Sequence, residues 1–211
     1  EAAVLGMSPT HSRQPSAGPP VTPCEISIVH GDLRFTEHAV MIGHYGGDQI
    51  VHAEAALDRC LDGALSARHQ LGVYPGDIGT AEVLLTPDEQ SPNRHGPTGA
   101  VVLGLGNVGE LSPGTLTRAV EAGLLRYAQA CRERGMDTTA LRLSTLLVGT
   151  GEAGVTTLQA LDAFLLALRN AARALQRIQS PEAQEPGAEP AAPLVHFAHL
   201  EFVELYEDVA L

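Results

Sequence analysis

Lysine and tryptophan are absent from this chain of 211 residues, and basic side chains are few. All 13 basic residues are arginine, against 25 acidic residues, which gives a formal net charge of −12 at pH 7. A surface that binds a nucleic acid backbone needs clustered positive charge, so we expect no nucleic acid partner. A single nucleotide held by backbone amide groups is still compatible with this composition.

Cysteine is scarce, and long apolar runs are missing. Cys24, Cys60 and Cys131 have no CxxC spacing, which argues against a disulfide framework or a zinc site and favours the reducing cytoplasm. No apolar run reaches the roughly 18 residues that a membrane span needs, so we expect no membrane-spanning segment. The first residues also lack the basic start and apolar stretch of a secretory signal.

Two segments of biased composition divide the chain. Residues 1–23 are rich in Ser, Pro, Gly and Gln, and residues 180–193 in Pro, Ala, Glu and Gln. These compositions predict a disordered leader and a flexible linker. We therefore expect one α/β domain at residues 24–179. Residues 194–211 predict a C-terminal strand and the start of a further segment that continues beyond Leu211.

Apolar periodicity predicts alternating strands and helices in the domain. Strands are expected at residues 25–30, 39–43, 80–85, 100–105 and 141–148, and a polar loop at 86–97. Helices are expected at 51–65, and from the Ser112-Pro113 start signal to Gly135. A last helix is expected to bury a stripe of Leu158, Leu161, Leu165, Leu168, Ala172 and Leu175. Parallel strands joined by such helices have right-handed crossovers, so the loops after them should emerge at one end of the sheet.

Three glycine-rich loops each follow an apolar strand and precede a helix. Residues 104–109 and 149–154 both match GxGxxG, and residues 43–48 read Gly-His-Tyr-Gly-Gly-Asp. Such loops can turn backbone N–H groups toward a phosphate, or can serve only tight turns and helix packing. On the first interpretation, Gly106 and Gly151 lie close together, with unpaired N–H groups facing a shared hollow. The candidate ligand-binding residues are Gly43, His44, Tyr45, Asp48, His52, Gly104, Gly106, Asn107, Gly109, Gly149, Gly151, Glu152 and Gly154.

Catalytic and metal-binding alternatives fit poorly. Gln129-Ala-Cys131-Arg132 matches most of the caspase motif, but Glu133 replaces its glycine and Cys131 continues the apolar stripe of a helix. Four histidines near carboxylates in the first third lack the i, i+4 pairing of a helical zinc site, so we expect them to be capping or surface residues: His30, His38, His44 and His52. We expect no catalytic residue, metal or cofactor in this chain.

The motifs and their order resemble a known family. The segment 43–58, GHYGGDQIVHAEAALD, followed by VVLGLG at 101–106 and STLLVGTGEAG at 144–154, is similar to macro-domain-like modules and to the non-catalytic N-terminal domain of leucyl aminopeptidases. More narrowly, it resembles a region of large bacterial proteins that carry a caspase-like CHAT protease domain. The resemblance implies a three-layer α/β/α sandwich with a mixed, mostly parallel sheet.

The resemblance also implies a function. Macro domains hold the diphosphate of ADP-ribose between two glycine loops, which correspond here to residues 104–109 and 149–154. The asparagine-rich stretch of macro domains is replaced by His52-Ala-Glu-Ala-Ala, which argues against ADP-ribose hydrolysis, and aminopeptidase chemistry would need a lysine. The implied role is a non-catalytic regulatory module that senses a small phosphorylated ligand. Its expected partner is a protease domain, either in the same polypeptide or in another protein. An interaction scaffold without ligand and an ADP-ribose-processing or peptidase-related enzyme are the alternatives.

Overall fold

The computed structural model describes residues 23–86, 96–150, 154–179 and 195–205. The predicted leader, the predicted linker and most of the polar loop at 86–97 lie outside these ranges, and so do Gly151 and Glu152. Within these ranges, no helix is long and apolar enough to cross a membrane.

Six strands of the described chain form one sheet. They are β1 (Glu25–His30), β2 (Ala39–His44), β3 (Ala81–Leu85), β4 (Gly99–Gly104), β5 (Leu141–Thr145) and β6 (Phe197–Glu204). Their order in the sheet is β1-β6-β5-β2-β4-β3, and every neighbouring pair is parallel except β3 and β4. The mixed, mostly parallel sheet is therefore confirmed. The strand expected within residues 194–211 is present as β6, and it lies inside this sheet because it pairs with both β1 and β5.

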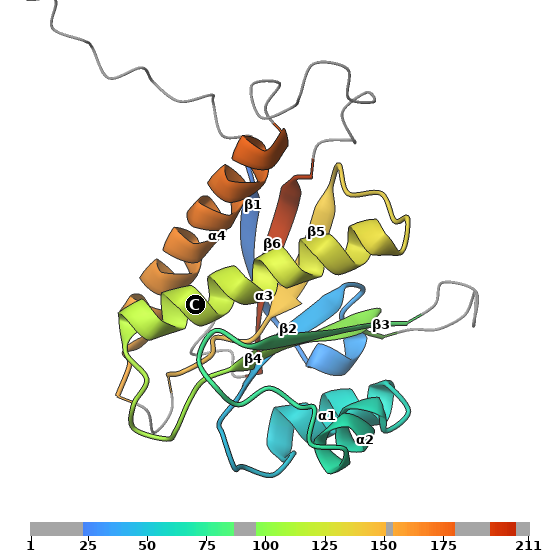
Figure 1. Cartoon of the computed structure of the whole chain (residues 1–211), viewed down its shortest axis with the longest axis vertical. Helices are drawn as coiled ribbons and strands as arrows, with labels where there is room; N and C mark the ends of the chain where they lie inside the picture. The colour runs from blue at the N-terminus through green and yellow to red at the C-terminus, as the bar shows by residue number, and fades with distance from the viewer. Residues whose placement is uncertain (1–22, 87–95, 151–153, 180–194, 206–211) are drawn as a thin grey trace, which may run out of the picture.

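Helices cover both faces of the sheet, which makes the expected three-layer sandwich. On one face lie α3 (Pro113–Glu133) and α4 (Thr157–Gln179), packed against each other (Figure 1). On the other face lie α1 (His52–Cys60), α2 (Ala64–Gln70) and the short 3-10 helix η1 (Leu33–Phe35). Met41 points into the core under α3 and α4, whereas Val40 and Ile42 face the α1 side. This alternation follows from the two-residue period of a strand.

Helix α3 has the boundaries that its sequence predicts. The Ser112 hydroxyl accepts a hydrogen bond from the Thr115 N–H at 3.2 Å, and the Thr115 hydroxyl accepts one from the Ser112 N–H at 2.8 Å. This reciprocal cap satisfies two of the N–H groups that a helix start leaves unpaired. Beyond the last turn, Gly135 has a φ of +69°, the left-handed conformation in which helices commonly end.

Helix α4 forms where expected, but its buried face is rotated relative to the predicted stripe and overlaps it only in part. Its inner face consists mostly of alanines around one aromatic ring: Ala160, Ala163, Phe164, Ala167 and Ala171. Two members of the predicted stripe, Leu158 and Leu165, are instead exposed. Alanine lets α4 lie close to α3, while the Phe164 ring reaches the sheet and packs at 5.4 Å from the Phe202 ring of β6. The predicted stripe is confirmed at Leu168, which is buried, and at Leu161 and Leu175, which pack against the core. It was wrong at Leu158 and Leu165, because leucine and alanine are both apolar and periodicity alone does not rank them.

The single helix expected at 51–65 is two helices. The chain turns between α1 and α2 through Asp62 and Gly63, both with positive φ, at 58° and 77°. The Asp58 carboxylate then caps α2, because its Oδ1 accepts from the N–H groups of Leu65 at 2.8 Å and Ser66 at 3.1 Å. A carboxylate at a helix N-terminus also interacts favourably with the helix dipole.

Candidate functional site

The glycine loops gather at one edge of the sheet. Strands β2, β4 and β5 are parallel and end at His44, Gly104 and Thr145, so the loops that follow them emerge on the same side. Because β3 runs antiparallel to β4, the segment before β3, residues 71–80, also lies at this edge. We call the described residues of these four segments, 45–51, 71–80, 105–112, and 146–150 with 154–156, the glycine edge. The expectation that the glycine loops emerge together is confirmed.

Backbone hydrogen bonds join three of these segments directly. The Gly46 N–H donates to the Gly106 carbonyl at 2.9 Å, and the Gly106 N–H donates to the Gly76 carbonyl at 2.8 Å. A Cβ atom built on Gly76 would lie 3.1 Å from the Gly46 Cα, which is closer than most real Cβ contacts. We call these three residues the glycine trio. Gly76 needs to be glycine because the Gly46 backbone is so close, and Gly106 because its φ is +77° and a Cβ atom there would lie 2.9 Å from the Ile78 side chain. At Gly46 a Cβ atom would make only ordinary contacts, at 3.7 Å or more.

The fourth segment packs onto the others through apolar side chains. Gly149 has a φ of +87°, and a Cβ atom there would lie 2.7 Å from a methyl group of Leu111. A Cβ atom on Gly43 would lie 2.5 Å from both Leu105 and Val148. The loops after β2, β4 and β5 therefore pack against one another through apolar side chains beneath the glycine edge.

One expectation for this edge is wrong. We expected the Gly106 N–H to be unpaired and to face a hollow, but it is donated to Gly76. The segment 71–80 competes for this amide because the antiparallel β3 brings it alongside β4. The exposed part of the loop is residues 107–110, where the Asn107 side-chain amide donates to the Glu110 carboxylate at 3.0 Å. Gly151, the other glycine of that expectation, lies outside the described residues.

A buried polar cluster lies at the end of β2. The His44 Nδ1 is 3.0 Å from the Glu54 Oε1, and both side chains are almost completely buried. The Tyr74 hydroxyl donates to the same Glu54 oxygen at 3.0 Å, and its ring packs edge-on against His44 at 4.8 Å. Burial, followed by the charge of Glu54, raises the pKa of Tyr74 far above its usual value. The hydroxyl therefore remains a donor throughout the physiological pH range.

His69 extends this cluster to the loop after β2. Its ring lies 5.7 Å from the rings of both His44 and Tyr74, and its Nε2 is 3.0 Å from the Asp48 carbonyl. The cluster thus fastens α1, α2 and segment 71–80 to the loop at 45–51. The expectation of a surface or capping role was wrong for His44, which is the last residue of a buried strand. Glu54, His69 and Tyr74 also belong to this cluster, although they lie outside the glycine motifs. The inward position of Glu54, three residues before the buried Leu57, is the signal that could have found it.

The remaining candidates of the first loop differ in exposure. Tyr45 is partly buried, and this burial raises the pKa of its hydroxyl. Asp48 is exposed, and its N–H donates to the Tyr45 carbonyl at 3.1 Å, which closes a turn. His52 is also exposed and begins α1 with a φ of 48°, an unusual value for a residue with a side chain. Asp48 and His52 therefore point to solvent beside the buried cluster.

The glycine edge contains no basic side chain. The four segments that form it include no arginine, lysine or histidine, while Asp48, Asp77 and Glu110 are exposed there. An anion at this edge would depend on backbone N–H groups and on the positive ends of α3 and α4. A neutral ligand group that forms hydrogen bonds would need no positive charge at this edge.

Neither cysteine nor metal chemistry gains support from the described residues. Cys131 is fully buried in α3, and burial raises the pKa of its thiol, which opposes a nucleophilic role. Across the described ranges, no group of three His, Cys, Asp or Glu side chains could hold a metal ion.

Comparison with known proteins shows similarity in structure only. No family model and no curated protein matches the sequence. Among solved structures, a mutant of the Oceanobacillus iheyensis macrodomain with ADPR is similar at a TM-score of 0.53 and 12% identity, over 90% of this chain and 90% of that one. The macrodomain of Thermus aquaticus DarG is similar at a TM-score of 0.50 and 13% identity, over 86% of this chain and 99% of that one. Such low identities show the fold alone, and the fold of this chain is that of the macrodomains.

Proposed function

We propose that this chain binds a ligand of the ADP-ribose type at the glycine edge. The observation that carries the proposal is the convergence there of three glycine-rich loops, each at the carboxyl end of a parallel strand. In open α/β sheets, ligands bind at this end of the strands. The macrodomain solved with ADPR supports the choice of ligand, since it shares the fold. Residues 107–110, together with segment 146–156, would form the part that contacts the diphosphate.

The proposed site differs from a phosphate site built on arginine or lysine. Because the four segments of the glycine edge contain no arginine, lysine or histidine, binding depends mainly on hydrogen bonds from the backbone and on helix dipoles. We therefore expect ADP-ribose to bind better than ADP or ribose 5-phosphate, since its two ends add contacts that carry no charge. We also expect affinity to change little with salt, because few ion pairs are formed.

Calorimetric titration of the chain with ADP-ribose, ADP and ribose 5-phosphate tests this directly. Val108→Glu is the informative variant, because Val108 is exposed at the tip of the loop at 107–110 and a carboxylate there repels a diphosphate. Met136→Glu is its matched control, an exposed apolar residue just beyond the other end of α3. We expect Val108→Glu to lower the affinity for ADP-ribose at least about tenfold, and Met136→Glu to leave this affinity unchanged. Absence of heat at millimolar ADP-ribose would refute the proposed ligand.

We further propose that the chain is a non-catalytic, cytoplasmic regulatory module of a protein with a caspase-like CHAT protease domain. The sequence resemblance at residues 43–58 and 144–154 supports this, and the burial of Cys131 agrees with a protease centre elsewhere. Peptide cleavage by the full-length protein, measured with and without ADP-ribose, tests the regulatory role. A cleavage rate that does not respond to the ligand, while the ligand binds, would reject regulation and leave binding standing.

One observation favours a scaffold without ligand as the second candidate. The Gly106 N–H is already used by Gly76, so at least one glycine of the GxGxxG loops serves packing between segments. On this interpretation all three loops only close the fold. The same titration separates the two candidates, since a scaffold gives neither heat nor a thermal shift with any of the three ligands.

A further inference from the structure

Helix α4 carries a continuous stripe of exposed side chains on the side away from the sheet. Its members recur at spacings of three, four or seven residues, which places them on one helix face. They are Leu158, Asp162, Leu165, Leu166, Arg169, Arg173 and Arg177. We call this set the outer stripe of α4. Its first half is mainly apolar and its second half is basic.

The apolar half is unusual for a helix whose other face is already buried. Leu158, Leu165 and Leu166 are 74%, 44% and 39% exposed, while the alanine-rich inner face packs on the sheet. A surface helix of a globular protein normally has one apolar face and one polar face. Contiguous exposed leucines on the second face are typical of a contact with another protein.

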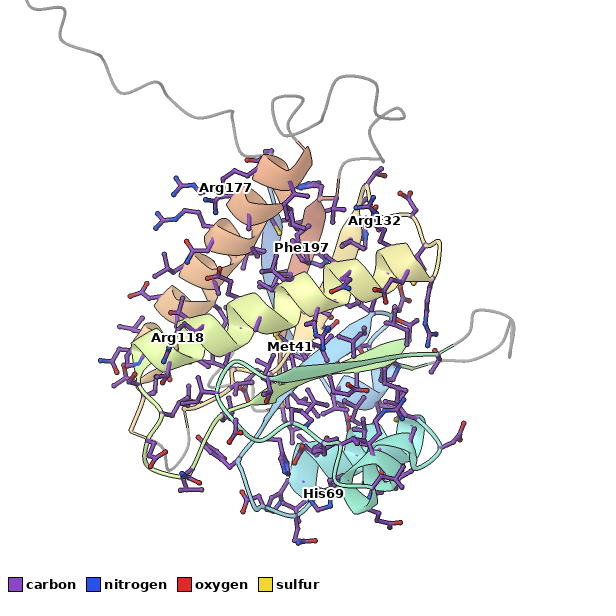
Figure 2. The ribbon with its side chains drawn as sticks, in the orientation of Figure 1. Met41, His69, Arg118, Arg132, Arg177 and Phe197 are labelled. Carbon is purple, nitrogen blue, oxygen red and sulfur yellow. The ribbon has the colours of Figure 1, made fainter. Side chains whose placement is uncertain are left out.

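The basic half is unusual for a chain with a net charge of −12. Arg169, Arg173 and Arg177 are four residues apart, and residues 163–181 contain no acidic residue. Within the part of the chain that the structure describes, none of these three forms an ion pair with a carboxylate. Arg177 extends on the outer side of α4 (Figure 2), where its Nε donates only to the Arg173 carbonyl of its own helix.

We propose that the outer stripe of α4 docks an amphipathic helix of another protein, acidic in its first half and apolar in its second. Arginines four residues apart stand about 6 Å apart along the axis, and glutamates four apart on a partner helix have the same spacing. A helix favours acidic residues near its N-terminus and basic residues near its C-terminus. The partner helix therefore runs antiparallel to α4, with its acidic half beside the arginines and its apolar half beside the leucines.

A nucleic acid fits this surface less well than a helix does. The apolar half would lie against nothing complementary on a phosphate backbone, and the remaining acidic surface repels a polyanion. The outer stripe of α4 shares no residue with 107–110 or 146–156, the segments that carry the ligand proposal, and Arg169 and Arg173 lie more than three helical turns beyond them. The two proposals therefore succeed or fail independently.

The test uses two synthetic peptides and the intact chain. The first peptide is a fluorescein-labelled helix of about 20 residues, long enough to match α4, with three glutamates four apart in its first half and leucines in its second. The second peptide has lysine in place of each glutamate. Binding is followed by fluorescence anisotropy at low and at physiological salt. We expect only the glutamate peptide to bind the unaltered chain, and more weakly as salt increases.

Charge reversal at the arginines is the decisive variant. In the double variant R169E/R173E we expect the affinity for the glutamate peptide to fall at least about tenfold, and the affinity for the lysine peptide to increase. The matched control is R118E/R126E, which makes the same charge change at exposed arginines of α3. We expect this control to change affinity for the glutamate peptide less than about twofold. Leu158→Ser tests the apolar half. It should weaken binding of the glutamate peptide, while the chain still prefers this peptide to the lysine peptide.

Three results would overturn the proposal. The first is an equal loss of affinity for the glutamate peptide in R118E/R126E and R169E/R173E. The second is an unchanged affinity of R169E/R173E for the lysine peptide. The third is displacement of the labelled glutamate peptide by a single-stranded RNA oligonucleotide at a lower concentration than the unlabelled glutamate peptide requires. Circular dichroism verifies that each variant is folded. If R169E/R173E is not folded, R169Q/R173Q removes both charges without introducing repulsion and should still weaken the glutamate peptide.

Discussion

The two helical layers of this sandwich are stabilised in different ways. Layer α3/α4 consists of long helices that bury apolar side chains, with Phe164 and Leu124 fully enclosed. Layer α1/α2 consists of short helices that depend on buried carboxylates. Among the residues that the structure describes, only Glu54 and Asp58 are buried acids, and both lie on α1.

The comparison indicates that one layer mainly stabilises the fold, while the other mainly holds a loop in a defined position. Apolar burial is strong but non-directional, so α3 and α4 can stabilise the sheet without fixing the position of any loop. A buried carboxylate needs hydrogen-bond partners at defined positions, because it is costly to bury without them. Glu54 meets this need through His44 and Tyr74, at the loop that borders the glycine edge. The layer with the weaker core therefore positions the candidate site.

The largest expected effect comes from removing the aromatic ring of α4. Phe164→Ala leaves a cavity against Phe202, and we expect it to lower the free energy of unfolding by about 3–5 kcal/mol. Urea denaturation followed by circular dichroism measures this loss. Leu158→Ala, at an exposed site of the same helix, should change the unfolding free energy by less than about 0.5 kcal/mol. Comparable losses in both variants would contradict the assignment of the inner face.

A smaller and more local effect is expected at Asp58. Asp58→Ala removes the cap of α2 and leaves two N–H groups without their acceptor, so we expect a loss of about 1–3 kcal/mol. Hydrogen exchange should show α2 opening first while α3 stays protected. Asp58→Asn keeps an accepting oxygen and should recover much of this protection. Uniform exchange across all helices in Asp58→Ala would argue against local capping.

Two tyrosines predict a loss of stability at high pH: the buried Tyr127 of α3 and the partly buried Tyr74, which packs against His44 and Glu54. Burial raises the pKa of both Tyr74 and Tyr127 well above the value of 10.0 expected for an exposed tyrosine. The unfolded chain loses these protons above pH 10 while the folded chain keeps them, so stability is complete below pH 10 and decreases above it. Each tyrosine should contribute up to about 1.4 kcal/mol per pH unit.

Urea midpoints between pH 9 and pH 11 in Tyr74→Phe and Tyr127→Phe measure these contributions separately. Lysine is absent, so no lysine titrates in this range. The thiols of Cys24 and Cys131, whose pKa values burial also raises, are present in every variant and cancel in the comparison. An unchanged pH slope in Tyr74→Phe would show that Tyr74 is not enclosed in the folded chain.

The smallest effect is a gain at the turn between α1 and α2. Asp62 is exposed and has a φ of 58°, a conformation that glycine adopts without steric cost. We therefore expect Asp62→Gly to stabilise the fold by about 0.5–1 kcal/mol, as a shift of the thermal midpoint. Asp62→Val, with a branched side chain, should shift the midpoint in the opposite direction.

Sequence patterns predicted most of layer α3/α4 because its signals are local. A cap at Ser112, a long apolar stripe and Gly135 are read directly from neighbouring residues. The face of α4 was predicted only in part because Leu165 and Ala167 are both apolar, and only the close approach of α3 selects the smaller one. Local patterns therefore define where a helix lies better than which of two apolar faces it buries.

Layer α1/α2 and the glycine edge were predicted less completely because their contacts join distant segments. The break at Asp62 depends on the Asp58 carboxylate reaching the start of the next helix. The convergence of the glycine loops followed from the handedness of parallel crossovers, which requires no side-chain detail. The pairing of Gly106 with Gly76 required the position of an antiparallel edge strand, which apolar periodicity does not give.

The glycine trio has a consequence for genetic screens of this chain. The backbones of Gly46, Gly76 and Gly106 meet at a single junction, and a methyl group at Gly76 or at Gly106 would collide there and separate the same segments. Once one contact is lost, a second alteration has little left to disrupt. We therefore expect the double variant with alanine at Gly76 and Gly106 to be about as defective as the worse of the two single variants. In such a screen, substitutions at Gly76 and Gly106 would therefore behave as alterations of one shared structural feature.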